Sequence, residues 1–194
     1  MGIPAGRCLA PVVPKVLLIL ADGFEEMEAV APIDILRRAK AEVTVAALGA
    51  GIHVTGRNGI VVHADTTLDA VLSGDPRDYD CLLLPGGPGV ALLRADPRVR
   101  ALVLRQNAAG RLLAAICAAP LVLADAGVLD GRRFTAHFST AAELPRYLPG
   151  ERTVEDGNIL TSRGAGTAAD FGLLLVERLF GRDLAREIAA SICA

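Results

Sequence analysis

The sequence has few aromatic residues and no excess of charge of either sign. Phe, Tyr and Trp make up 4% of the 194 residues, and Trp is absent, although hydrophobic residues of all kinds reach 52%. The core must therefore be built from Ala, Leu and Val, a composition that favours helices layered on a sheet. With 20 basic and 22 acidic residues the net charge is −2, so the chain lacks the basic footprint of a nucleic-acid-binding domain.

Membrane-spanning and export signals are also missing. The apolar run from Val16 to Ala21 is far too short to cross a bilayer. Residues 1–14 contain three prolines and no apolar signal-peptide segment. We expect residues 1–14 to be a flexible leader, residues 15–194 to form a single domain, and the protein to be cytoplasmic and not bound to membranes.

The cysteines show no pairing or metal-binding pattern. The chain has four of them, widely spaced and without a C-x-x-C motif: Cys8, Cys81, Cys117 and Cys193. This usage is typical of reduced thiols in a cytosolic protein rather than of a disulfide framework or a zinc site. We therefore expect no metal and no cofactor.

Strand-like and helix-like segments alternate along the chain. Buried-strand patterns lie at 15–20, 42–47, 80–84 and 112–116, and helical patterns at 25–39, 96–110, 120–126, 168–179 and 182–192. The Asn-Gly turn within 52–63 predicts a hairpin, residues 154–162 predict a hairpin or two edge strands, and residues 134–137 predict a short strand. Pro32 either kinks the first helix or marks its true start. The alternation predicts an α/β fold with a mostly parallel sheet covered on both faces.

Cys117 follows the apolar run 112–116 and comes just before Pro120, a residue suited to the first turn of a helix. This strand-to-helix turn has the form of a nucleophile elbow, with Cys in place of Ser. A helix N-terminus at this place predicts a lowered thiol pKa. A small core cysteine explains the same spacing about equally well, so both interpretations stay open at this point.

Further candidates fall at the carboxyl ends of expected strands. Glu28 follows the first strand, Gly86 and Gly87 follow the strand that contains Cys81, and His137 ends the expected strand 134–137. Glutamates in a first helical turn are often only capping charge, and a glycine loop alone is weak support. Ligands of parallel α/β sheets bind outside the carboxyl ends, however, so this convergence favours a real pocket.

Four segments in this order resemble motifs of the ThiJ/PfpI superfamily, in the branch of the Parkinsonism-associated deglycases. They are Asp22-Gly23-Phe24-Glu25-Glu26-Met27-Glu28, Leu84-Pro85-Gly86-Gly87, Ala115-Ile116-Cys117-Ala118-Ala119-Pro120 and Leu160-Thr161-Ser162-Arg163-Gly164-Ala165-Gly166-Thr167. The resemblance runs from Lys15 through nearly all of the remaining chain. It implies a flavodoxin-like three-layer sandwich and a homodimer.

The resemblance also implies roles for particular residues. Cys117 would be the nucleophile, Glu28 its carboxyl partner, and the N–H groups of Gly87 and Ala118 the oxyanion donors beside Gly86. His137 would stand nearby as a further catalytic group. Arg38, Arg57 and Asp34 match positions that shape the pocket and the dimer interface.

Two functions follow from this resemblance. One is a cofactor-independent enzyme acting on methylglyoxal, glyoxal or early glycation adducts of amines, with Glu28 sharing a proton with Cys117 and moving protons on the substrate. The other is a redox-sensing, chaperone-like protein in which Cys117 is oxidised. A peptidase is disfavoured, because Ala118 stands where the protease-like branch has His, and the His-x-Glu pair of the glutamine amidotransferases is missing.

Overall fold

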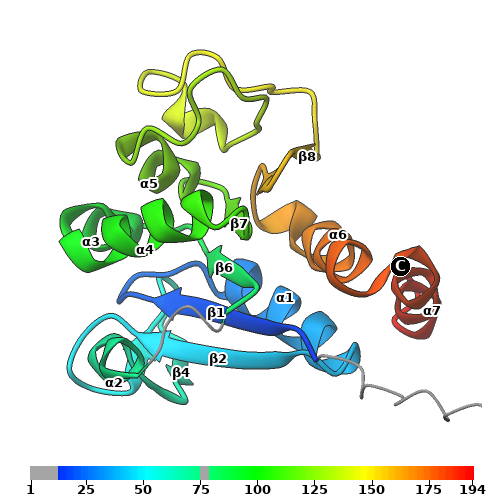
Figure 1. Ribbon diagram of the computed structural model, residues 1–194, viewed down its shortest axis with the longest axis horizontal. Coiled ribbons are helices and arrows are strands. Elements are labelled where there is room, and N and C mark those ends of the chain that lie inside the picture. Colours follow the sequence, from blue (N-terminus) through cyan, green and yellow to red (C-terminus); the bar gives the residue numbers. More distant parts are fainter. Residues whose placement is uncertain (1–12, 75–78) are drawn as a thin grey trace, which may run out of the picture.

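The computed structural model describes residues 13–74 and 79–194. Most of the expected leader 1–14, including Cys8, lies outside the described residues. A central sheet stands between two helical layers (Figure 1). The expected α/β three-layer fold is therefore confirmed.

The sheet has seven strands in the order β5-β2-β1-β6-β7-β9-β8. Their bounds are β1 Lys15–Leu20, β2 Glu42–Ala47, β5 Thr66–Thr67, β6 Cys81–Leu84, β7 Leu112–Ile116, β8 Thr153–Asp156 and β9 Ile159–Ser162. All neighbouring strands run parallel except β8 and β9, which form a hairpin at one edge. The chain leaves β1 for β2 on one side and later returns to β6 on the other, so ligand chemistry is expected between the carboxyl ends of β1 and β6.

Alternate residues of the central strands bury their side chains on opposite faces of the sheet. In β1, Val16, Leu18 and Leu20 belong to one buried cluster, and Leu17 and Ile19 belong to the other. Because both faces are covered, the central strands are almost continuously apolar, which is why they could be recognised in the sequence.

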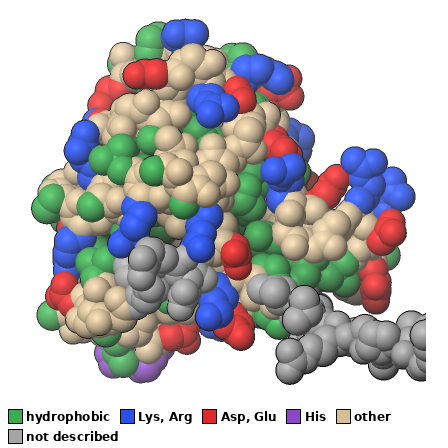
Figure 2. Space-filling model, in the orientation of Figure 1, with side chains coloured by type: hydrophobic (Ala, Val, Ile, Leu, Met, Phe, Trp, Pro, Cys, Tyr) green, Lys and Arg blue, Asp and Glu red, His purple; other side chains and the backbone are tan. Residues whose placement is uncertain are grey.

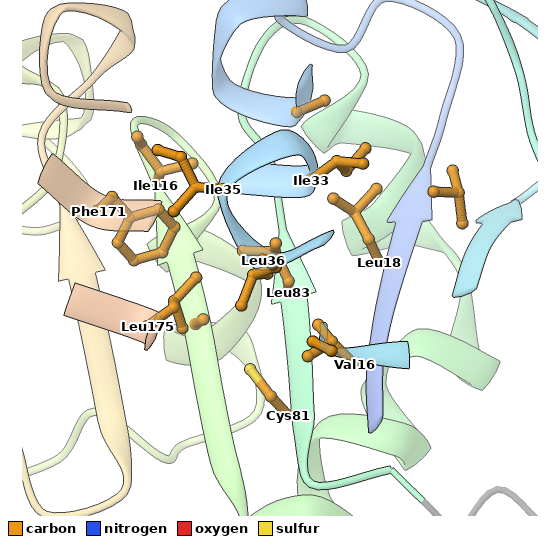
Figure 3. Close-up of a cluster of buried hydrophobic side chains, with 14 of the residues drawn as sticks. Val16, Leu18, Ile33, Ile35, Leu36, Cys81, Leu83, Ile116, Phe171 and Leu175 are labelled. Atoms are coloured by element: carbon orange, nitrogen blue, oxygen red, sulfur yellow. The ribbon is translucent and has the colours of Figure 1, made fainter. Parts of the chain in front are cut away.

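Each face of the sheet is covered by its own set of helices. The first set is α1 Glu26–Arg38, α6 Ala168–Phe180 and α7 Arg182–Ser191. The second is α2 Leu68–Ser73, α3 Val90–Ala95, α4 Pro97–Ala108 and α5 Pro120–Asp125. Figure 3 shows the first core, in which Phe171 and Leu175 of α6 lie near Ile35 and Leu36 of α1 above the strands.

Pro32 lies inside α1 and does not mark its start. The helix begins at Glu26, where the side chain of Glu25 caps it by accepting a hydrogen bond from the backbone N–H of Glu28 at 2.9 Å. At Pro32 the helix packs on α6 at Gly172, where an added Cβ would lie 3.2 Å from the Pro32 Cα and 2.9 Å from Ile35. Gly172 therefore lets the two helices approach closely.

Residues 134–137, the two-residue strand β5 and the six-residue helices α2 and α3 differ from the expectation. Residues 134–137 form no strand, and both edges of β9 are already paired, with β7 and β8. The N–H of Thr135 bonds instead to the side-chain hydroxyl of Thr161, at 2.9 Å. The helix α3, directly after the glycine loop, was not expected, because only six residues form it.

The expected hairpin around the Asn-Gly turn is confirmed as β3 His53–Thr55 and β4 Val61–His63. It docks on the loop after β1, where the N–H of Gly23 bonds to the carbonyl of Thr55 at 2.7 Å and that of Arg57 to the carbonyl of Phe24 at 2.8 Å. Its turn is further anchored by Glu26, which accepts from the N–H of Asn58 at 2.6 Å. The hairpin therefore holds Arg57 close to the start of α1.

None of the helices in the described part of the chain combines the length and the apolar character needed to cross a membrane.

Candidate active site

Cys117 lies in the turn between β7 and α5, with its backbone in the left-handed region at φ 65°. For a residue with a side chain this conformation is strained, and surrounding contacts must hold it. They do so here, because the N–H of Cys117 donates to the carbonyl of Ser162 and its carbonyl accepts from the N–H of His137, both at 2.8 Å. Pro120 occupies the first turn of α5 as expected. The turn thus has the strained geometry of a nucleophile elbow.

Glu28 enters the same place from the first turn of α1. Its side chain is only 1% exposed, and Oε2 accepts a hydrogen bond from the N–H of Gly86 at 2.9 Å. A buried carboxyl with this fixed partner is not a solvated capping charge. The capping role belongs to its neighbour Glu25.

Gly86 shows how closely the thiol and the carboxyl converge. A Cβ built on Gly86 would lie 2.6 Å from Glu28 Oε2, 2.6 Å from the Cys117 Cβ and 3.0 Å from the Cys117 Sγ. The next residue, Gly87, has φ 95° and lies against the backbone of the loop after β1, with a Cβ position only 2.6 Å from the N atom of Glu25. Glycine is required at both positions, at the first for space and at the second for conformation as well.

Burial and mutual repulsion set the protonation of the Glu28–Cys117 pair. Desolvation is the main cause that raises the pKa of Glu28 to about 7. Desolvation, followed by the negative charge of Glu28, raises the pKa of Cys117 to about 12. The lowered thiol pKa expected from the helix N-terminus is therefore wrong, because burial and a like charge outweigh the dipole of a six-residue helix. At neutral pH Cys117 is therefore a thiol and Glu28 is about half ionised, so the pair carries about half a negative charge.

The backbone N–H groups of Gly87 and Ala118 act on the sulfur of Cys117. Each lowers the pKa of the thiol, although less than burial raises it. Two convergent N–H donors beside a nucleophile can stabilise negative charge that develops on an oxygen bound there.

His137 and Arg57 complete the group. Gly164 is the second residue after β9. A Cβ built on it would lie 3.4 Å from the His137 ring and 3.9 Å from Glu28 Oε1. Ser139 positions the ring, with its hydroxyl 2.8 Å and its backbone N–H 3.3 Å from Nδ1 of His137. Burial lowers the pKa of His137, and the positive charge of Arg57 lowers it further. The expected residues Cys117, Glu28, Gly86, Gly87, Ala118, His137 and Arg57 are thus brought together, although His137 does not end a strand.

Asp34 and Arg38 lie elsewhere. They form an ion pair of 2.8 Å on the exposed side of α1, with side chains 55% and 47% exposed. Arg38 is ten residues, or about 15 Å of helix, beyond Glu28. The structure does not bring this pair into the pocket.

A hollow of about 560 Å³ lies beside His137 and Gly164, and its wall includes Phe138, Arg152 and Arg163. None of these three residues was expected from the sequence to be a site residue. Arg163 comes directly after β9, and Glu28, Gly86 and Cys117 likewise come after strands. This position at the carboxyl edge of the sheet is the sequence feature that could have identified Arg163 as a site residue.

Fold and site together define a flavodoxin-like α/β protein with a buried carboxyl beside an elbow cysteine. Residues 14–178 match the model of the DJ-1/PfpI family. The chain is 40% identical over 180 residues to the protein dj-1beta of Drosophila melanogaster, covering 91% of this chain and 95% of that protein. It is 34% identical to the deglycase TK1284 of Thermococcus kodakarensis, covering 78% of this chain and 91% of that protein.

Solved structures agree. The crystal structure of Drosophila melanogaster DJ-1beta matches with a TM-score of 0.89 and 38% identity, covering 94% of this chain and 99% of that one. A structure of oxidised Toxoplasma gondii DJ-1 matches with a TM-score of 0.87 and 37% identity, covering 93% and 98%. The chain belongs to the DJ-1/PfpI family.

Proposed function

We propose that the protein is a cofactor-independent enzyme that converts small dicarbonyls, or their early adducts with amines, into 2-hydroxy acids. The observation that carries this proposal is the convergence of the Glu28 carboxyl, the Cys117 thiol and two backbone N–H donors around Gly86. A relative named a deglycase supports the same class of activity.

In the proposed reaction Glu28 takes the thiol proton, and the Cys117 sulfur adds to the aldehyde carbon of methylglyoxal. The N–H groups of Gly87 and Ala118 stabilise the oxyanion, which then takes the proton from Glu28, so that a hemithioacetal forms and Glu28 is a carboxylate again. Glu28 next removes the proton from the former aldehyde carbon and returns one to the neighbouring carbon, through an enediol. Water then cleaves the resulting thioester to lactate and the free thiol.

The pKa of Glu28, at about 7, suits it to this step, since a general base works best near its own pKa. His137, whose pKa is lowered by burial, lies beside the pair as a neutral hydrogen-bonding group for the substrate. Early glycation adducts would enter the same cycle when the thiolate displaces the amine.

The test is lactate formation from methylglyoxal with no glutathione, metal or nucleotide added. We expect turnover by the wild type and a loss of about 10²-fold or more in Glu28→Gln, which keeps the shape but cannot carry the proton. Wild-type turnover in Glu28→Gln, or no turnover by the wild type, contradicts the mechanism.

A second candidate is a redox sensor that uses the same thiol. The oxidised state named for the Toxoplasma gondii relative favours it. One peroxide would convert the thiol of Cys117 to a sulfenic acid with release of water, and a second would give the sulfinic acid, within reach of the Gly87 and Ala118 N–H groups. Mass spectrometry after peroxide treatment tests this hypothesis, which requires two added oxygen atoms on Cys117 and none on Cys81.

We also propose that the protein works as a homodimer through the exposed face of α1. Met27 and Val30 are 58% and 47% exposed, and Asp34 and Arg38 continue the same helix face. Ile60 and Val61 of the adjoining hairpin are also more than half exposed, at 57% and 55%. Exposed apolar side chains in adjoining elements are typical of an interface.

Light scattering should give the mass of a dimer for the wild type and the mass of a monomer for Val30→Glu. A wild-type monomer at micromolar concentration refutes this assembly.

A further inference from the structure

Two of the three histidines face each other across the β3–β4 hairpin, away from the Cys117 site. His53 and His63 are directly opposed partners, and both are exposed. Their ring centres are 4.8 Å apart, and their planes meet at 84°. The histidine colour in Figure 2 lies at the end of the molecule that carries β4 in Figure 1. Nothing in the proposed reaction uses these rings.

The backbone fixes the two rings side by side. The N–H of Ala64 bonds to the carbonyl of Ile52 at 2.7 Å, and that of Gly56 to the carbonyl of Ile60 at 2.8 Å. Hydrogen-bonded and non-hydrogen-bonded pairs alternate along an antiparallel ladder, so His53 and His63 occupy a non-hydrogen-bonded pair. Cross-strand side chains come closest at such positions.

This spacing fits a shared metal ion. An imidazole nitrogen binds zinc at about 2.0–2.1 Å, which places the ion about 3.2 Å from each ring centre. Two rings on one ion then have centres about 4.5 Å apart at a right angle and about 5.2 Å apart at a tetrahedral angle. The observed 4.8 Å lies between these values.

The pair is open to solvent, since both histidines are exposed. Val54, between His53 and Thr55, turns into the core and is 3% exposed. The carboxylate of Asp65, two residues after His63, is engaged elsewhere, since its Oδ2 accepts from the N–H of Val45 at 2.8 Å and from Arg37 at 3.2 Å. Within residues 13–74 and 79–194 no group of three or more His, Cys, Asp or Glu is placed to hold a metal ion, so water would complete the coordination.

We propose that His53 and His63 chelate one divalent transition metal ion per chain on the outer face of this hairpin. Metals that favour imidazole, such as Ni²⁺, Cu²⁺ and Zn²⁺, fit the site, whereas Mg²⁺ and Ca²⁺ prefer oxygen ligands. An imidazole must be neutral to bind a metal ion, so affinity is weaker in acid.

The test is calorimetric titration of the metal-free protein with NiCl₂, at pH 7.5 and at pH 5.5. We expect one Ni²⁺ per chain at pH 7.5, affinity at least about tenfold weaker in His53→Asn or His63→Asn, and further loss in the double variant. His137→Asn and Cys193→Ser are the matched controls, and both should bind Ni²⁺ as the wild type does. Paramagnetic broadening of both ring signals in NMR identifies the ligands directly.

Three results would overturn the proposal. Unchanged affinity in the double variant means that other groups hold the ion. Wild-type affinity in either single variant means that one imidazole suffices. Half an ion per chain means a site shared between two copies rather than a chelate within one hairpin.

Discussion

Two cysteines on neighbouring strands of the same sheet have very different surroundings. Cys81 begins β6 and is 0% exposed in a purely apolar cluster, where burial raises its pKa strongly (Figure 3). Cys117 follows the carboxyl end of β7, in a strained turn beside Glu28. Burial affects both thiols, so burial alone does not distinguish them. What distinguishes the two thiols is their position along the strand. Only at the carboxyl edge of the sheet do loops bring a carboxyl, glycine N–H groups and a histidine to the sulfur.

Replacing Cys117 and Cys81 one at a time tests this contrast most directly. The largest effect on methylglyoxal turnover is expected here. Cys117→Ser should lower methylglyoxal turnover by at least about 10³-fold with little change in stability, since an alcohol is a poor nucleophile at its ordinary pKa. Cys81→Ala should keep turnover within about twofold while lowering the free energy of unfolding by about 1 kcal/mol through the small cavity it leaves. Equal loss of turnover in both variants would show that Cys117 has no special role.

Filling the space at Gly86 should have the next largest effect. The Cβ of Gly86→Ala would force Cys117 and Glu28 apart, and a shift of about 1 Å in reacting groups costs about 10²-fold in rate. Gly49→Ala is the matched control, because nothing lies within 4 Å of its Cβ position. Circular dichroism checks that both variants fold. Full turnover in folded Gly86→Ala would mean that the close approach of these groups is not needed.

The same contrast shows which features the sequence could predict. The runs 15–20, 80–84 and 112–116 were readable because strands buried on both faces are continuously apolar. The segment 134–137 was also expected to be a strand, but both edges of β9 are already paired and the segment stays outside the sheet. Local patterns carry no information about which edges are occupied.

The protonation of the site was only half predictable. A raised pKa of Glu28 follows from any apolar pocket with a second acidic group, and it is found. The predicted direction of the pKa shift of Cys117 was wrong, because the sequence shows the start of a helix but not how deeply the thiol is buried. The roles of Asp34 and Arg38 stay predictions that depend on a second copy of the chain. The cytoplasmic location also stays a prediction.

The next effect, of about one order of magnitude, is expected on the alkylation rate of Cys117 in Glu28→Gln. The negative charge of Glu28 helps to raise the pKa of Cys117, so Glu28→Gln should lower that pKa. We expect iodoacetamide to modify Cys117 about tenfold faster at pH 7.5 in Glu28→Gln, which corresponds to a thiol pKa lower by about one. Peptide mapping follows each thiol, and Cys81 should remain unmodified in both proteins. Slower modification in the variant would mean that Glu28 activates the thiol more than it repels the thiolate.

The smallest expected effect is on the pH dependence of stability. The pKa of Glu28 rises from 4.5 to about 7 on folding, so the folded state holds this proton more tightly than the unfolded state does. The resulting stabilisation is fully present below about pH 4.5 and is lost as the pH rises through 7, at about 1.4 kcal/mol for each pH unit between these two values. Gln does not titrate, so Glu28→Gln should gain stability relative to the wild type between pH 5 and pH 8. For a chain of this size that amounts to a relative rise in Tm of several degrees, about 2–4 °C per kcal/mol.

The exposed carboxylate of Glu42, at the amino end of the sheet, supplies the control, and Glu42→Gln should follow the wild-type pH profile in the same thermal melts. A Tm difference between Glu28→Gln and the wild type that stays constant over this range would show that Glu28 is already ionised at pH 5.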